Sequence, residues 1–130
     1  MRPPANTQLY ETPISTHWID ENGIMCAVSK RVERSIAHYT KVMELYQKFI
    51  KGEEKLCLLS DATDSMPVSA EIRDFMAAEM PKYVKAHAII SSSEFKGSLM
   101  STVLQFSFFG FPVMKFATEE EAKEWLKLYL

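Results

Sequence analysis

The chain has 130 residues, of which 47% are hydrophobic and 25% are charged, and these values are typical of one globular domain. Fifteen basic and seventeen acidic residues give a formal charge of −2, which argues against nucleic acid or an anionic membrane surface as the main partner. No stretch has the roughly 18 consecutive apolar residues of a membrane span, so we expect no membrane insertion. Residues 1–8 lack the apolar centre of a secretion signal, and we interpret them as a loose arm of a single cytoplasmic domain over residues 1–130.

The chain lacks the local motifs that catalysis, metal binding or cofactor binding usually require. Its two cysteines, Cys26 and Cys57, lie within apolar runs and are typical of small buried side chains in a reducing compartment. The three histidines, His17, His38 and His87, are far apart without metal-ligand spacing, so we expect structural or surface roles. No Gly-x-Ser-x-Gly, glycine-rich phosphate loop or Cys-x-x-Cys occurs. We therefore expect no catalytic residue, no metal and no cofactor.

The first part of the chain predicts a hairpin and then a helix. An Asn22-Gly23 pair stands between the strand-like runs 14–19 and 24–29, which is a strong hairpin signal. The second run begins with continuously apolar residues, so its strand is expected to be the more central of the two. Over residues 33–50 the apolar residues recur at spacings of three and four, which predicts an amphipathic helix with Gly52 as its stop.

Residues 56–60 predict the central strand, because Leu56, Cys57, Leu58 and Leu59 suit a strand that is buried on both faces. Turn-forming residues follow, and then Pro67 and Ser69 are suited to the start of a helix over 68–80 that Pro81 closes. Ligands and modifications of open α/β sheets lie at the carboxyl ends of strands. The loop after this strand is therefore the expected centre of function.

The second part of the chain continues the alternation of strands and helices. Residues 86–91 predict a strand, residues from Ser91 to Gly110 a third helix, and residues 111–116 an edge strand. The last helix opens with Thr118-Glu119-Glu120-Glu121, which is a capping box. The predicted order β-β-α-β-α-β-α-β-α indicates a single α/β domain, with a mostly parallel sheet, an N-terminal antiparallel hairpin and helices packed against the sheet.

Three features of this order resemble one family. They are the N-terminal hairpin, the apolar strand that runs into a polar loop over residues 56–69, and the ending from Phe116 to Leu126, which reads F-A-T-E-E-E-A-K-E-W-L. Together they resemble the STAS domains, more specifically the SpoIIAA-like or STAS/SEC14 branch, over nearly the whole chain. The resemblance implies a SpoIIAA-like fold and a regulatory role without catalysis.

The resemblance also implies a phosphorylation site. In the anti-sigma-factor antagonists of that family, a partner kinase phosphorylates a serine at the start of the helix after the central strand, and the phosphate breaks the complex. The corresponding candidates here are Ser65 and Ser69, with Thr63 as a third, although the Asp-Ser-Ser-Gly run of the family is missing. A phosphate there would meet the N–H groups of a helix N-terminus, whereas Asp61 and Asp64 would repel it.

The same loop residues also have a simple structural interpretation. Ser65 and Ser69 are suited to capping a helix, and Asp61 and Asp64 are suited to Asx turns. Two carboxylates without further oxygen ligands at a recognisable spacing do not predict a metal site. We interpret Asp61 and Asp64 as part of the loop surface that meets a partner.

An aromatic cluster at the end of the third predicted helix is the second candidate region. A single helix cannot turn all of its phenylalanines inward, so the cluster predicts a buried helix end, a dimer or partner surface, or the wall of a ligand pocket. The residues assigned to this pocket or interface are Phe95, Leu99, Val103, Phe106, Phe108 and Phe109.

Our main hypothesis from the sequence is a non-enzymatic STAS-like regulatory or protein-interaction domain. It has an unidentified protein partner, forms a homodimer, and is switched by phosphorylation within residues 63–69. The alternative is a domain that binds a small apolar ligand or a lipid in a pocket beside the third helix. An enzyme is the least favoured class. An apolar cavity at the third helix would favour the ligand, and a filled core with exposed phenylalanines would favour association.

Overall fold

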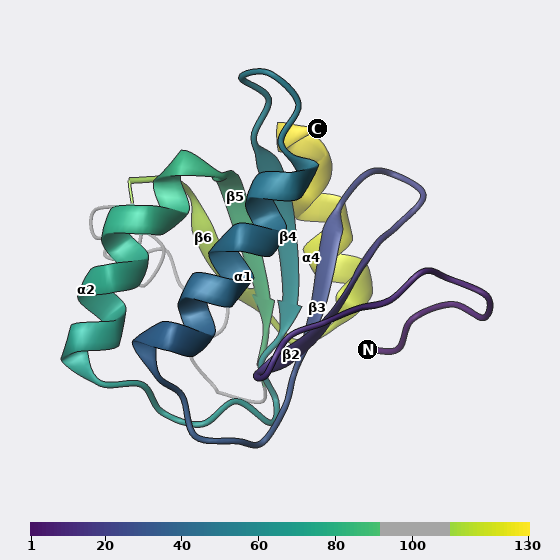
Figure 1. Cartoon of the computed structure of the whole chain (residues 1–130). Helices are drawn as coiled ribbons and strands as arrows, with labels where there is room; N and C mark the ends of the chain where they lie inside the picture. The colour runs from purple at the N-terminus through teal and green to yellow at the C-terminus, as the bar shows by residue number, and fades with distance from the viewer. Residues whose placement is uncertain (92–109) are drawn as a thin grey trace.

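The protein, described here by a computed structural model for residues 1–91 and 110–130, is built on one sheet of six strands (Figure 1). The strands follow one another across the sheet in the order in which they occur along the chain. Their bounds are β1 (Tyr10–Glu11), β2 (Ser15–Ile19), β3 (Met25–Ser29), β4 (Leu56–Asp61), β5 (Val84–Ile90) and β6 (Val113–Phe116).

The sheet is mixed, with an antiparallel part and a parallel part. β1, β2 and β3 pair antiparallel, whereas β3, β4, β5 and β6 pair parallel. Asp20 closes the hairpin between β2 and β3, because its Oδ1 accepts hydrogen bonds from the N–H groups of Asn22 and Ile24, both at 2.9 Å. Gly23 has a φ of +81°, a conformation that L side chains rarely adopt. The predicted hairpin and the central position of its second strand are confirmed.

Helices cover both faces of the sheet (Figure 1). Helix α1 (Ile36–Phe49) and helix α2 (Ala70–Glu79) pack on one face, and helix α4 (Glu119–Leu126) packs on the other. Short 3₁₀ segments over Met80–Lys82 and Lys127–Tyr129 extend α2 and α4. The protein is therefore an α/β domain with helical layers on either side of a mixed sheet.

Side-chain caps determine where the helices begin. The hydroxyls of Ser69 and Thr118 accept hydrogen bonds from the N–H groups of Ile72 and Glu121, and both caps match the sequence prediction. Helix α1 begins at Ile36 and not at residue 33, because Ser35 has an extended backbone and caps it through the N–H of His38. The sequence pattern alone placed the start of this helix too early.

The apolar residues of β4 contribute to two hydrophobic cores. Leu58 packs in the core beneath α1 and α2, and Leu59 packs in the core beneath α4. Cys26 and Cys57 are buried and free, as predicted, and burial raises the pKa of the Cys26 thiol to about 12. A strand with apolar side chains on both faces is suited to the centre of such a sheet.

The other elements differ from the prediction mainly at their ends. β5 begins at Val84, two residues before the predicted start, and ends at Ile90, one residue before the predicted end. β6 begins at Val113, two residues after the predicted start, and ends at Phe116 as predicted. The short strand β1 was not predicted, because two residues carry no readable alternation. The third helix, predicted between Ser91 and Gly110, falls on residues 92–109 and lies outside the described residues.

We expect the substitution Leu58→Ala to lower the free energy of unfolding by about 2–5 kcal/mol, because it leaves a cavity in a core where Leu58 is 1% exposed. Urea unfolding followed by circular dichroism measures this. Leu128→Ala is the matched control, since Leu128 is 75% exposed and the same truncation should change stability by no more than about 0.5 kcal/mol. Similar losses in the two variants would contradict the described core.

Candidate functional site

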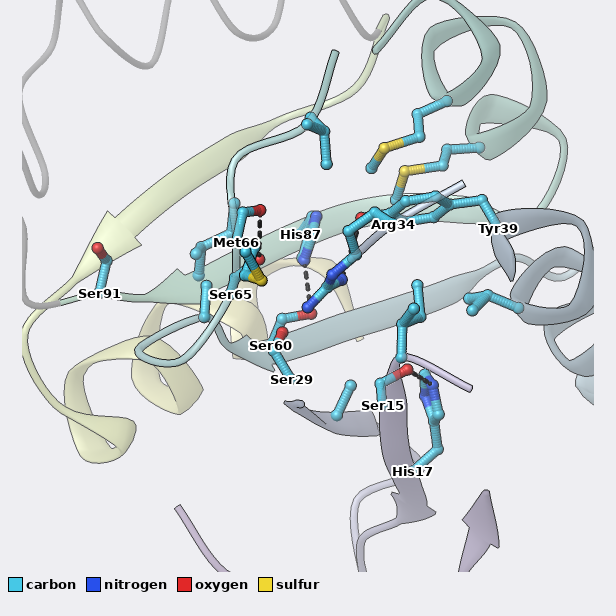
Figure 2. Close-up of a pocket in the computed structure, with 18 of the residues that line it drawn as sticks. Ser15, His17, Ser29, Arg34, Tyr39, Ser60, Ser65, Met66, His87 and Ser91 are labelled. Carbon is cyan, nitrogen blue, oxygen red and sulfur yellow. Dashed lines mark hydrogen bonds between the residues drawn. The ribbon is translucent and has the colours of Figure 1, made fainter. Parts of the chain in front are cut away.

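A cavity of about 400 Å³ lies between the sheet and the helices α1 and α2 (Figure 2). Its floor is the face of β2 to β6 that these helices cover, and its walls include the loop that connects β4 to α2. Volumes of this order are typical of small-molecule sites. Within the described part of the chain, this cavity is the strongest candidate for a functional site.

The strand register brings polar side chains together on the cavity floor. His17, Ala27, Ser60, Ile89 and Lys115 are successive partners across β2 to β6, so they form one row on the same face. All five line the cavity. A row this close to the carboxyl ends of the parallel strands lies where open α/β sheets bind ligands.

The next row towards the amino ends of the parallel strands is apolar except for His87. Its other members include Leu58 and Val113, which are the partners of His87 on β4 and β6. His87 lies diagonally opposite Ser60 on the same face, and its Nε2 is 2.9 Å from Ser60 Oγ (Figure 2). This hydrogen bond joins two adjacent central strands through their side chains.

A second serine–histidine pair lies on β2, at another part of the cavity wall. Ser15 Oγ lies 2.6 Å from His17 Nε2, and the two side chains share a face because they are two residues apart on a strand (Figure 2). Ser15 Oγ is in turn 2.9 Å from Thr12 Oγ1, and the ring of Tyr46 packs edge-on against His17. His17 is 1% exposed, and its Nδ1 has no hydrogen-bond partner among the described residues.

Both histidines are neutral at physiological pH. Burial lowers the pKa of His87 to about 4. Burial also lowers the pKa of His17 to about 4, although the nearby Glu11 acts in the opposite direction. Such weakly basic imidazoles are poor general bases, because an efficient base has a pKa near the working pH.

Among residues 1–91 and 110–130, no carboxylate in the cavity lining completes a catalytic triad with Ser60 and His87. In a Ser-His-Asp triad a carboxylate binds the second imidazole nitrogen and orients the base. No Asp or Glu is among the described residues that line the cavity. Within the described residues, the hydrogen bond between Ser60 and His87 therefore satisfies two polar groups on the cavity floor without a carboxylate to orient the imidazole.

Arg34 enters the cavity from the segment that precedes α1 (Figure 2). Its Nη1 donates to the hydroxyl of Tyr39 and its Nη2 donates to the carbonyl of Lys30, both at 3.1 Å. Its Nε is buried and has no partner among the described residues. The guanidinium is thus held by two neutral acceptors.

The loop after β4 is anchored at its start by Asp61. Asp61 Oδ1 accepts hydrogen bonds from the N–H of Thr63 at 3.0 Å and from its hydroxyl at 2.6 Å. Asp61 Oδ2 pairs with the terminal amine of Met1 at 2.9 Å. Burial acts to raise the pKa of Asp61, but the hydrogen bonds from Thr63 and the Met1 amine outweigh it and lower the pKa. Asp61 is the last residue of β4 and is buried.

The remaining loop residues named from the sequence lie on the surface. Asp64 and Ser65 are exposed, and Asp64 pairs with Arg31 at 3.6 Å. Ser69 is exposed too, and its hydroxyl caps α2. Ser65 lines the cavity mouth together with residues 66–68. The loop therefore has an outer surface and an inner face on the cavity.

Sequence reasoning did not identify the cavity residues on the strands. The signal in the sequence was a polar residue at an inward position of an apolar strand, as with His87 between Ala86 and Ala88. The aromatic region that was predicted as a pocket or interface lies outside the described residues, namely Phe95, Leu99, Val103, Phe106, Phe108 and Phe109.

Two further properties concern residues 1–91 and 110–130. No helix in that part of the chain is both long enough and apolar enough to cross a membrane. In the same residues no three His, Cys, Asp or Glu side chains gather in a way that could hold a metal ion.

The chain belongs to the family described as Domain of unknown function (DUF7793), which matches residues 17–130. No curated protein and no solved structure matches the chain. The matched range includes both cavity histidines, Arg34 and the whole loop after β4.

We expect stability to fall between pH 6.5 and pH 4, because the unfolded chain binds protons at His17 and His87 more readily than the folded protein. Replacing both histidines by glutamine should therefore reduce the loss of unfolding free energy between about pH 7.5 and pH 5 by on the order of 1–2 kcal/mol per histidine. Urea unfolding at each pH measures it.

The matched control for this experiment is His38→Gln, since His38 lies on α1 and does not line the cavity. It should leave the pH dependence as in the unmodified protein. An unchanged pH dependence in the His17→Gln/His87→Gln variant would contradict the neutral burial of the two imidazoles.

Proposed function

We propose that this protein is a non-enzymatic, STAS-like regulatory domain that binds a small ligand in the cavity beneath α1 and α2. Ligand occupancy is passed to a protein partner through the loop over residues 61–69. The observation that carries the proposal is that Ser65, Met66, Pro67 and Val68 of this loop are themselves part of the cavity wall. A molecule in the cavity contacts the loop directly.

The two sides of the loop support separate roles. Met66 and Val68 are partly buried on the cavity side, whereas Thr63, Asp64 and Ser65 are exposed. The inner side chains contact the ligand and the outer ones are available to a partner. The fold also supports a STAS-like assignment, because a hairpin followed by parallel strands and covering helices is what the resemblance implies.

Phosphorylation of the loop is a second proposed means of regulation, and Ser65 is the favoured site. The Ser69 hydroxyl already accepts the hydrogen bond that caps α2, whereas the Ser65 hydroxyl makes only a contact of 3.5 Å to the carbonyl of Met66. Ser65 is exposed, and Arg31 lies beside the loop, 3.6 Å from Asp64, as a cation that a phosphate can recruit. The proposed partner is another protein, and a second copy of this chain is the alternative.

A library of small fragments tests ligand binding by saturation-transfer NMR, with the backbone amide shifts of residues 63–69 as the readout of the loop. We expect fragments to bind and to move these amide signals. Ser29→Phe should abolish binding, because Ser29 lines the cavity and a phenyl ring there occupies the space.

Thr40→Phe is the matched control, since Thr40 is exposed on α1 and outside the cavity lining. It should bind fragments as the unmodified protein does. The proposal fails if no fragment binds, or if fragments bind Ser29→Phe with unchanged affinity.

Intact-mass measurement with site mapping, on protein recovered from its native host, tests the phosphorylation. We expect a phosphoryl group on Ser65 and none on Ser69. Protein that is unmodified under every growth condition, or that is modified on Ser69, would contradict regulation by phosphorylation of Ser65 and leave ligand binding as the proposed signal.

Light scattering of the purified protein, with and without partner candidates, separates a homodimer from a complex with another protein.

A further inference from the structure

The described residues that line the cavity carry basic side chains without acidic ones. They include Arg34 and Lys115 and no carboxylate. Other basic residues nearby do have acidic partners, as Arg31 has Asp64. None of the ion pairs found within residues 1–91 and 110–130 includes Arg34 or Lys115. The neutral histidines neither add to this positive charge nor offset it.

Arg34 has hydrogen-bonding capacity that the described residues leave unused. A guanidinium has five N–H donors and no acceptor, and it stays protonated in proteins. Two of these donors bind Tyr39 and Lys30, and both acceptors are neutral. The guanidinium fork matches a carboxylate in charge and in shape, so an anion that enters the cavity is stabilised there by charge-assisted hydrogen bonds.

The rest of the cavity suits an apolar body. The side chains of Val42, Met43, Met76 and Met80 form much of the wall on the side of the helices. Methionines adapt to ligands of different shape because their side chains are unbranched and flexible. A volume of about 400 Å³, at roughly 30 Å³ for each water-sized group, accommodates a molecule of about a dozen heavy atoms.

We infer that the ligand is a small organic monocarboxylate, with its carboxylate on Arg34 and its apolar body against the methionine-rich wall. This inference rests on the proposed function, since it names the ligand class of the same cavity. A carboxylate fits better than a phosphate, because no glycine-rich loop lines the cavity in the described residues to supply a set of backbone N–H donors. The serines on the floor, Ser29 and Ser60, are suited to bind the second carboxylate oxygen.

Isothermal titration of the unmodified protein with four eight-carbon probes tests this directly. The probes are octanoate, octanamide, octylamine and octyl phosphate, at about pH 7.5, where octanoate is an anion and octylamine a cation. We expect octanoate to bind most tightly, and octanamide to bind about tenfold or more weakly, as expected for the loss of one charge-assisted contact. Octylamine should not bind measurably.

Variants then identify the cation. Arg34→Met should weaken octanoate about tenfold or more and octanamide much less, because the carboxylate loses a charge-assisted contact and the amide oxygen only a neutral one. Arg31→Met is the matched control, since Arg31 is exposed and lies outside the cavity lining, and it should bind all probes normally. Lys115→Met should have a smaller effect than Arg34→Met. Circular dichroism and thermal melting check that each variant is folded, and the four-probe series does not depend on any variant.

The outcomes separate this inference from the proposed function. Equal binding of octanamide or octylamine and octanoate overturns the carboxylate assignment but leaves a ligand-binding cavity. Tighter binding of octyl phosphate overturns the choice of carboxylate in favour of a phosphorylated ligand. If no octyl probe binds while other fragments do, the inference fails alone. If neither binds, both fail.

Discussion

The parallel pairing of β4 with β3 and β5 determines which side chains reach the cavity. Leu58 and Ser60 face α1 and α2, whereas Cys57 and Leu59 face α4. Because side chains alternate along a strand, a slip of one residue would exchange the two sets and bring Ser60 among the apolar residues beneath α4. Exchanging the four apolar residues of β4 between the two faces costs little, because both faces are apolar. Loss of the hydrogen bond between Ser60 and His87 costs more, since that bond forms in only one register.

The strand register also explains how polar side chains can be buried at this site. A buried polar group without a partner costs about 1–3 kcal/mol, so histidines inside an apolar wall need acceptors or donors close by. Ser15 and Ser60 meet this need at the Nε2 atoms of the two histidines. His17 Nδ1 and Arg34 Nε have no such partner among the described residues.

Local patterns predicted the elements of the fold, and long-range register determined the site. The Asn22-Gly23 pair and the caps at Ser69 and Thr118 are decided by residues a few positions apart, so the sequence identified them. That His87 meets Ser60 depends on the bulge between Leu56 and Cys57, where the register of β4 and β5 shifts, and no local pattern indicates a bulge. Ser60 and His87 were therefore each recognisable in the sequence as polar residues of apolar strands, but their contact could not be predicted.

The loop over residues 61–69 has properties that suit it to carry a signal. It is held at its start by Asp61, which binds Thr63 and the Met1 amine, and at its end by the Ser69 cap. Between these anchors, Met66 and Val68 line the cavity, and Ser65 is exposed at its mouth. A ligand can shift such a loop only by as much as its affinity differs between the two loop arrangements. Under the proposed function, contacts from a ligand to the loop itself would create that difference without a relay through the rest of the fold, because residues 65–68 are part of the cavity wall.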